Sequence, residues 1–177
     1  MLITVTGGVG SGKTRFALDY AARISREGIY LSTGDHDPVN PELPSAHYRA
    51  ISAVKGPQLA QVIDQINRES NLYLADQRIL IVDSLTAWMA ASFDVCDNLN
   101  EQRNDTQKLL GALLSYQGKL LVITNEMHAS LQPSEKERVF AARMASVNRM
   151  LQSHSDRMFM LVSGLAIDLK SHALRYE

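Results

Sequence analysis

The sequence of 177 residues has a single cysteine, Cys96, and almost no excess charge of either sign. One cysteine cannot form an intrachain disulfide, and it excludes a zinc site built from several cysteines. The 18 basic and 19 acidic side chains leave a formal net charge of −1, which argues against binding of nucleic acid or a membrane surface through bulk positive charge. No apolar run approaches the roughly 18 residues of a membrane-spanning helix. We therefore expect no nucleic-acid and no membrane partner.

The first residues, Met1 to Thr6, also lack the basic segment of a secretory signal peptide. Hydrophobic residues make up 45% of the chain and charged residues 21%, which is typical of a folded globular protein and not of a disordered one. The length suits one domain with one core. The simplest interpretation is a cytoplasmic protein that folds as a single domain over residues 1–177.

Short apolar runs alternate with segments of helical periodicity along the chain. The predicted strands are residues 2–6, 29–32, 50–54, 78–83, 119–124 and 158–162, with a weaker antiparallel edge strand at 167–169. The predicted helices are residues 14–26, 57–66, 85–93, about 99–116 and 134–154, and Gly28 is the expected stop signal of the first. Continuously apolar strands that alternate with helices imply a mostly parallel sheet with helices on both faces. The predicted fold class is α/β.

Glycine is concentrated in one place, since four of the ten glycines lie between residues 7 and 12. The segment Gly7-Gly-Val-Gly-Ser-Gly-Lys-Thr14 satisfies the pattern G-x-x-x-x-G-K-[ST] between a predicted strand and a predicted helix. Its glycines let successive backbone N–H groups point at phosphate oxygens, and the next helix presents its positive end to the same anion. We expect a nucleoside triphosphate to bind through Gly7, Gly8, Val9, Gly10, Ser11, Gly12, Lys13 and Thr14.

Three residues of this region are candidates for the chemistry of phosphate transfer. Lys13 reaches the β- and γ-phosphates and is a catalytic candidate, and the Thr14 hydroxyl is a candidate Mg²⁺ ligand. Asp83 ends the most strongly apolar strand, where phosphate-loop proteins place a Mg²⁺ carboxylate. Alternatively, Asp83 caps the helix that follows, a role that Ser84 could also fill. The expected cofactor is Mg²⁺, with ATP or GTP as substrate.

Other segments share the order and spacing of one known family. They are Val5-Thr-Gly-Gly with Arg15 and Ala17, Tyr30-Leu-Ser-Thr33, Val82-Asp-Ser-Leu-Thr-Ala-Trp88, Thr124-Asn-Glu126 with Pro133, the helix residues Arg138, Phe140 and Asn148, and Gly164-Leu with Lys170. In these features the chain resembles the adenosylcobinamide kinase / adenosylcobinamide-phosphate guanylyltransferase family over nearly its whole length. The resemblance implies a RecA-like P-loop NTPase fold, assembly as a homotrimer, and Ser32 and Thr33 as further nucleotide-binding candidates.

The resemblance also implies two reactions and a second substrate, adenosylcobinamide. In the first reaction, a nucleoside triphosphate phosphorylates the aminopropanol hydroxyl of adenosylcobinamide. In the second, GTP transfers GMP to that phosphate through a guanylylated histidine, and pyrophosphate is released. Glu126 ends a strand at the carboxyl edge of the predicted sheet, where α/β proteins bind ligands. There it would orient or deprotonate the substrate hydroxyl, or hold a Mg²⁺-bound water; the equal alternative is a loop carboxylate that caps the next helix.

The chain departs from the family pattern around the expected histidine nucleophile. A proline-rich loop, residues 37–44, replaces the family's histidine-bearing helix. Counted from the phosphate loop, His47 falls at the position of the guanylylated histidine. Read locally, His47-Tyr-Arg-Ala resembles a later His-Trp-Arg-Thr of the family, which would leave the nucleophile deleted. His36 is a poorer candidate for the same role.

Other departures lie at His128 and Ser130, where the family has glycines, and at Ala141 and Ala142, where it has Arg-Asp. There are two alternatives to a cobinamide kinase, and these departures motivate the first. One is a nucleotide-binding regulatory or assembly protein that has lost the cobinamide site. The other is a kinase of another small alcohol, because no residue in the sequence by itself identifies a corrinoid.

Overall fold

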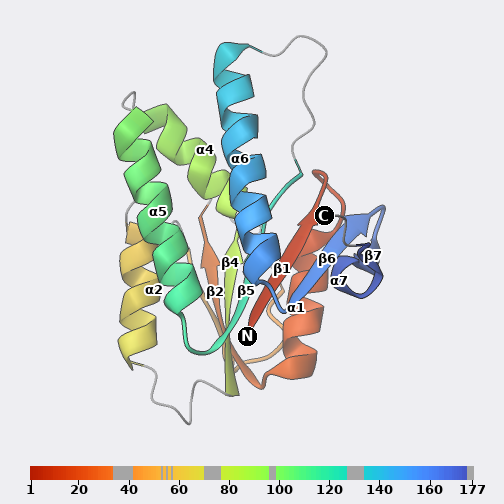
Figure 1. The fold of residues 1–177 in the computed structure, drawn as a ribbon. Coiled ribbons are helices and arrows are strands. Elements are labelled where there is room, and N and C mark those ends of the chain that lie inside the picture. Colours follow the sequence, from red (N-terminus) through yellow and green to blue (C-terminus); the bar gives the residue numbers. More distant parts are fainter. Residues whose placement is uncertain are drawn as a thin grey trace.

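Seven strands form one sheet in the order β3-β2-β4-β5-β1-β6-β7 in the computed structural model of the chain (Figure 1). The structure describes residues 1–33, 42–52, 54, 56, 58–69, 77–95, 99–126 and 134–174. The strands are β1 (Leu2–Gly7), β2 (Glu27–Ser32), β3 (Tyr48–Ile51), β4 (Arg78–Asp83), β5 (Lys119–Ile123), β6 (Arg157–Val162) and β7 (Leu165–Asp168). The helices are α1 (Lys13–Ile24), α2 (Gln58–Glu69), α4 (Leu85–Val95), α5 (Leu99–Ser115), α6 (Glu135–His154) and α7 (Leu169–His172). Cys96, His36, His128 and Ser130 lie outside the described residues.

The sheet is parallel except at one edge, which confirms the predicted α/β class. Strands β1, β2, β3, β4, β5 and β6 pair in parallel, and β7 pairs antiparallel with β6. The predicted edge strand therefore exists, although it begins at Leu165, two residues earlier than expected. Strand β3 likewise begins at Tyr48, earlier than the predicted residue 50.

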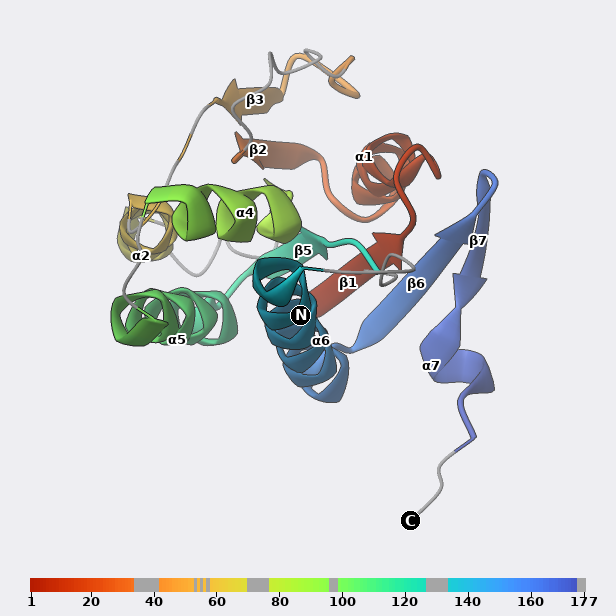
Figure 2. The same ribbon diagram turned by 90° about the horizontal axis from the view of Figure 1, so that it is seen from above.

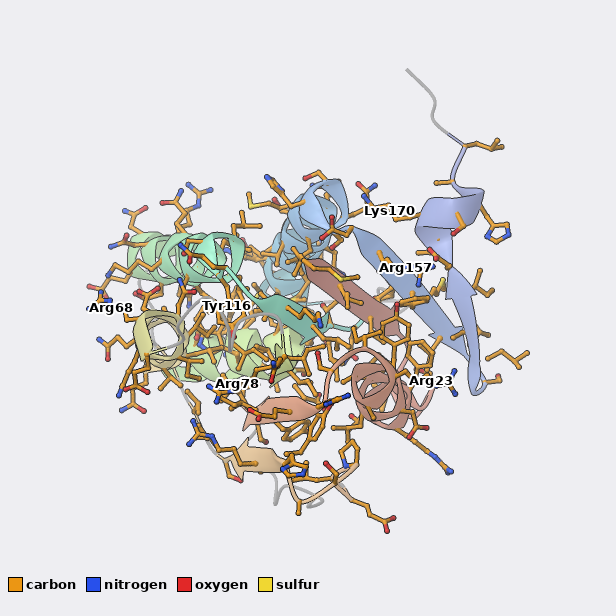
Figure 3. The ribbon with its side chains drawn as sticks, turned by 90° about the horizontal axis from the view of Figure 1, so that it is seen from below. Arg23, Arg68, Arg78, Tyr116, Arg157 and Lys170 are labelled. Atoms are coloured by element: carbon orange, nitrogen blue, oxygen red, sulfur yellow. The ribbon has the colours of Figure 1, made fainter. Side chains whose placement is uncertain are left out.

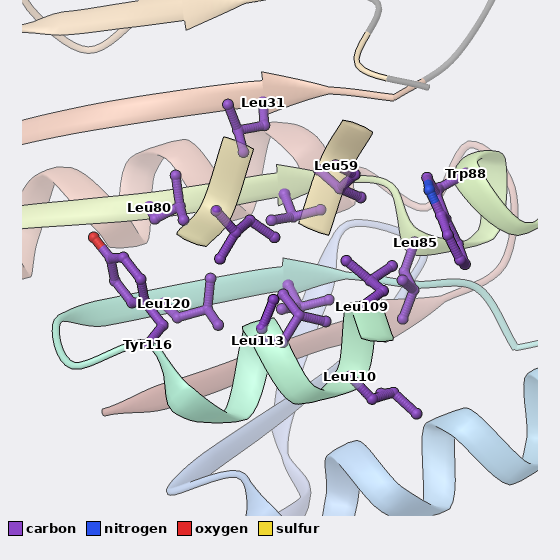
Figure 4. Close-up of a cluster of buried hydrophobic side chains, with 14 of the residues drawn as sticks. Leu31, Leu59, Leu80, Leu85, Trp88, Leu109, Leu110, Leu113, Tyr116 and Leu120 are labelled. Atoms are coloured by element: carbon purple, nitrogen blue, oxygen red, sulfur yellow. The ribbon is translucent and has the colours of Figure 1, made fainter. Parts of the chain in front are cut away.

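Alternate side chains of the central strands pack into two cores, one on each face of the sheet. Along β4, Leu80 and Val82 face the helices α2, α4, α5 and α6, whereas Ile79 and Ile81 face α1. Figure 2 shows α1 on one side of the strands and these four helices on the other, and Figure 4 shows part of the core on the α5 side. Trp88 is fully buried there, and its indole N–H donates to the carbonyl of Gly56 at 2.7 Å. Trp88 is thus a core residue.

The strands begin at one side of the sheet, the amino edge, and end at the other, the carboxyl edge, and the two sides carry different residues. Arg78 and Arg157, at the first positions of β4 and β6, belong to the amino edge, and both are labelled in Figure 3. Arg78 lies 3.5 Å from Glu27, the first residue of β2. The candidate phosphate loop follows β1 at the opposite, carboxyl edge.

The predicted role of Gly28 as a helix stop is wrong. Helix α1 ends earlier, where the N–H of Ser25 donates to the carbonyl of Ala21 at 2.9 Å. Gly28 lies inside β2, paired with Tyr48 of β3. A Cβ at Gly28 would stand 2.2 Å from Cε1 of the Tyr48 ring. Only glycine fits at this position, because the Tyr48 side chain lies directly against the backbone of residue 28.

We expect Gly28→Ala to lower the free energy of unfolding by about 1–3 kcal/mol, because the buried Tyr48 ring must move. The ring has little freedom, since its hydroxyl donates to the carbonyl of Ser25 at 2.9 Å. Urea unfolding measures the change. Gly111→Ala on α5 is the control: a Cβ there meets nothing within 4 Å, and its stability should rise by up to about 1 kcal/mol. Unchanged stability of Gly28→Ala would contradict the close packing.

Candidate functional site

The candidate residues gather where three neighbouring strands end. Strand β1 leads into the phosphate loop, β4 ends at Asp83, and β5 leads into Asn125 and Glu126. Because β1 pairs in parallel with β5 and β5 with β4, these three strand ends meet at one edge of the sheet. The sequence motifs therefore come together in space as expected.

The phosphate loop has backbone angles that favour glycine at three positions. Gly7, Gly10 and Gly12 have φ values of 149°, 72° and 91°, which side chains rarely allow. At Gly7 there is also no room, because a Cβ would stand 2.5 Å from the carbonyl oxygen of Leu161. The turn between β6 and β7 supports the loop from the same side, since the N–H of Gly164 donates to the carbonyl of Ser11 at 3.2 Å.

Lys13 begins α1, and its side chain curls back over the loop. Nζ donates to the carbonyl of Gly8 at 2.6 Å, and only 9% of the residue is exposed. Burial lowers the pKa of Lys13 from its ordinary value, and the nearby charge of Asp83 partly opposes that shift. A phosphate beside Nζ would stabilise the buried ammonium in the same way, so this position is suited to an anion.

Thr14 and Asp83 form the second half of the site. The Thr14 hydroxyl donates to Oδ2 of Asp83 at 2.6 Å, and the hydroxyl of Tyr30 donates to the same oxygen at 2.8 Å. A hydroxyl beside a carboxylate at a phosphate loop is an all-oxygen donor set of the kind that Mg²⁺ prefers. Burial, and then the charge of Asp83, raises the pKa of Tyr30 far above its ordinary value, so the phenol stays protonated.

The alternative role of Asp83 as a helix cap is filled by its neighbour. The Ser84 hydroxyl accepts a hydrogen bond from the N–H of Ala87 at 3.1 Å, in the first turn of α4. The Asp83 carboxylate is directed instead to Thr14 and Tyr30. Ser84 therefore fills the N-cap position, and the metal-binding role of Asp83 stays a prediction.

Glu126 lies at the same edge, next to the end of β1. Its Oε1 accepts a hydrogen bond from the hydroxyl of Thr6 at 3.0 Å, and Thr6 directly precedes the phosphate loop. Glu126 is partly exposed, whereas Thr6 is fully buried. The carboxylate is thus held against the loop by a side chain whose own position is fixed by packing.

A buried polar network fixes the turn that carries Glu126. Asn148 of α6 accepts from the Thr124 hydroxyl at 2.8 Å and donates to the carbonyl of Asn125 at 3.1 Å. The N–H of Asn125 donates to the Thr86 hydroxyl of α4 at 2.8 Å. Two helices therefore hold the end of β5 through side chains that are buried or nearly so.

Two other predicted nucleotide-binding residues are buried behind the site. Ser32 pairs with Asp83 across the strands, and its carbonyl accepts from the N–H of Val54 at 3.0 Å. Thr33 is fully buried, and its hydroxyl donates to the carbonyl of Ser84 at 2.6 Å. In this arrangement both residues join the ends of neighbouring strands, and their contact with a nucleotide stays a prediction.

His47 lies at the opposite edge of the sheet. It is exposed, and its carbonyl accepts from the N–H of Gly28 near the start of β2. Because β3 runs parallel to β2, the length of β3 separates His47 from the carboxyl edge by roughly 13 Å. The structure does not bring His47 to the phosphate loop.

A pocket of about 570 Å³ opens beside the loop, along the outer side of α1. Thr14, Arg15 and Asp19 line it on the helix side, and Glu42 to Pro44 line the other side. Both charge signs are present in its walls. The pocket therefore has space for a small polar group next to Thr14.

Sequence reasoning assigned no site role to Tyr30 or Thr6. Tyr30 pairs with Ile81 across β2 and β4, two residues before Asp83. Side chains two residues apart share a face of a strand, so the contact between Tyr30 and Asp83 follows once the register is known. The sequence shows both residues but not that register.

The loop, the hydroxyl–carboxylate pair and the parallel sheet together define a P-loop nucleotide-binding protein. A family model described as cobinamide kinase / cobinamide phosphate guanyltransferase matches residues 3–169, and the chain belongs to this family. None of the curated proteins matches the chain significantly. The resemblance stated from the motifs is therefore confirmed, and with it the P-loop fold.

The described residues lack the features of two other kinds of site. No helix among them is long and apolar enough to cross a membrane. The same part of the chain has no group of three or more His, Cys, Asp or Glu side chains placed to hold a metal ion.

We expect Asn148→Ala to lower the free energy of unfolding by about 1–3 kcal/mol, because it removes both hydrogen bonds that join α6 to Thr124 and Asn125. Urea unfolding measures the loss. The control is Gln152→Ala on the exposed side of the same helix, where the change should stay within about 0.5 kcal/mol. Equal effects of the two substitutions would show that the network adds nothing to stability.

Proposed function

We propose that the chain is a Mg²⁺-dependent kinase that transfers the γ-phosphoryl group of ATP or GTP to the aminopropanol hydroxyl of adenosylcobinamide. The observation that carries the proposal is the hydroxyl–carboxylate pair of Thr14 and Asp83 beside the loop lysine, in a chain of the cobinamide kinase family. Phosphoryl transfer depends on positioning and charge neutralisation more than on covalent chemistry. These residues supply both.

The loop and Lys13 would bind the triphosphate. Backbone N–H groups of the loop and the positive end of α1 surround the phosphates, and the ammonium of Lys13 offsets the charge that develops on the transferred group. Bound Mg²⁺, held by Thr14 and Asp83, would supply further charge neutralisation at the β- and γ-phosphates.

Glu126 is the proposed partner of the acceptor alcohol. Its Oε1 is engaged by Thr6, and the other carboxylate oxygen would accept the proton of the substrate hydroxyl. The alcohol oxygen then forms a bond to the γ-phosphorus as the bond to the β-phosphate oxygen breaks, and ADP or GDP leaves. The proton on Glu126 is later released to solvent.

The family description also names a guanyltransferase activity, and GMP transfer to cobinamide phosphate is the proposed second reaction. The motif resemblance further favours a homotrimer, and a cytoplasmic location is proposed from the composition of the sequence. The departures at His128, Ser130, Ala141 and Ala142 keep a nucleotide-binding protein without kinase activity as the rival. Turnover stimulated by the acceptor separates the two.

We expect Lys13→Ala to reduce phosphorylation of cobinamide by at least about 100-fold, because it removes a charged donor aimed at the transferred group. In the assay, the protein is incubated with GTP or ATP, Mg²⁺ and cobinamide, and the products are identified by mass spectrometry. Lys108→Ala on the exposed face of α5 should keep wild-type activity. Undiminished phosphorylation by Lys13→Ala would overturn the assignment. Nucleotide binding without acceptor-stimulated turnover in the wild-type protein would favour the regulatory role.

The guanylyl step is tested separately with α-labelled GTP. Because His47 lies at the amino edge, we expect His47→Ala to match the wild-type protein both in acid-labile protein labelling and in the rate of phosphorylation. Denaturing gels after acid and base treatment report the label. Selective loss of the label in His47→Ala would show that this residue is the nucleophile.

A further inference from the structure

Tyr30 occupies a position that neither the sequence motif nor the proposed kinase chemistry explains. Its hydroxyl donates to Oδ2 of Asp83 at 2.8 Å, the same oxygen that accepts from the Thr14 hydroxyl at 2.6 Å. Two hydroxyl groups from different elements, β2 and α1, therefore meet on one carboxylate oxygen. Neither of these two hydroxyl groups donates to the other carboxylate oxygen, Oδ1.

Packing of the Tyr30 ring in the hydrophobic core, and not a contact within the site, fixes the position of its hydroxyl. Tyr30 is 5% exposed, and its ring packs in the hydrophobic cluster between the sheet and α1. It stands beside Ile81 on β4, so its ring extends along the sheet toward Asp83, two residues further on. Because the ring is confined by packing, the hydroxyl is a fixed donor and not an adaptable one.

We propose that Tyr30 is a positioning residue of the metal site, which holds the Asp83 carboxylate so that Oδ1 faces the cation bound with the nucleotide. The inference rests on the proposed function, in which Thr14 and Asp83 hold Mg²⁺. When the Thr14 oxygen serves the cation, the bond from Tyr30 still fixes the rotation of the carboxylate. Hydrogen-bond partners behind a metal ligand set its orientation in this way.

The test compares Tyr30→Phe with Tyr48→Phe, a matched control in the same cluster. Tyr48 is also 5% exposed, and its hydroxyl donates to a backbone carbonyl, that of Ser25, at 2.9 Å. Each substitution removes one buried hydroxyl and keeps the ring. Binding of a fluorescent, non-hydrolysable GTP analogue is measured in EDTA and across a Mg²⁺ titration, without any acceptor, and thermal melting confirms that each variant is folded.

We expect Tyr30→Phe to bind the analogue in EDTA as the wild-type protein does, but to need roughly tenfold more Mg²⁺ for the half-maximal metal effect. Tyr48→Phe should keep the wild-type Mg²⁺ response even if its melting temperature falls. In the kinase assay, saturating Mg²⁺ should restore most of the kcat of Tyr30→Phe.

Two results would overturn the inference. One is an unchanged Mg²⁺ response in Tyr30→Phe, and the other is an equal shift in both variants, which would indicate general loosening of the core. Because the binding assay contains no acceptor, a failure to phosphorylate cobinamide would count against the proposed function and leave this inference standing. Conversely, an unchanged Mg²⁺ response in Tyr30→Phe would leave the kinase assignment intact.

Discussion

Parallel pairing of β1 with β5, and of β5 with β4, is the constraint on which the site depends. The phosphate loop, Asp83 and Glu126 are separated by about 70 and 40 residues along the chain, and each follows a buried strand. In parallel strands all carboxyl ends lie at one edge, so the strand pairing by itself brings these groups together. The same constraint removes His47 from the site, because it precedes its strand instead of following it.

Much of this arrangement was predictable, because its signals are local. Four consecutive aliphatic residues before Asp83 mark a strand buried on both faces, and the glycine pattern marks a loop whose backbone angles most residues avoid. The remaining contacts depend on register. The bond from Tyr30 to Asp83, the bond from Thr6 to Glu126 and the crossing of Tyr48 over Gly28 join residues on different strands, and periodicity does not reveal how strands are aligned.

Most of the buried polar residues in the described part of the chain lie at the carboxyl edge of the sheet. Thr6, Lys13, Thr124 and Asn148 are all buried there, and each has a hydrogen-bond partner from the loop or a neighbouring element. Groups of this kind are costly to bury unless they are paired. Their concentration on one side suits a binding edge, whereas the opposite edge has fewer buried polar groups and carries strand-initial residues such as Arg78, which pairs with Glu27.

The turn between β6 and β7 gives the phosphate loop a dependence on the far end of the chain. Leu161 fills the space behind Gly7, and Gly164 binds the carbonyl of Ser11, so the loop is shaped by residues more than 150 positions away. The loop has this conformation only when residues 7–11 have met residues 161–164. A bound nucleotide would then stabilise that long-range closure, and not merely the first strand and helix; in a protein under synthesis, it could act only after Gly164 had emerged.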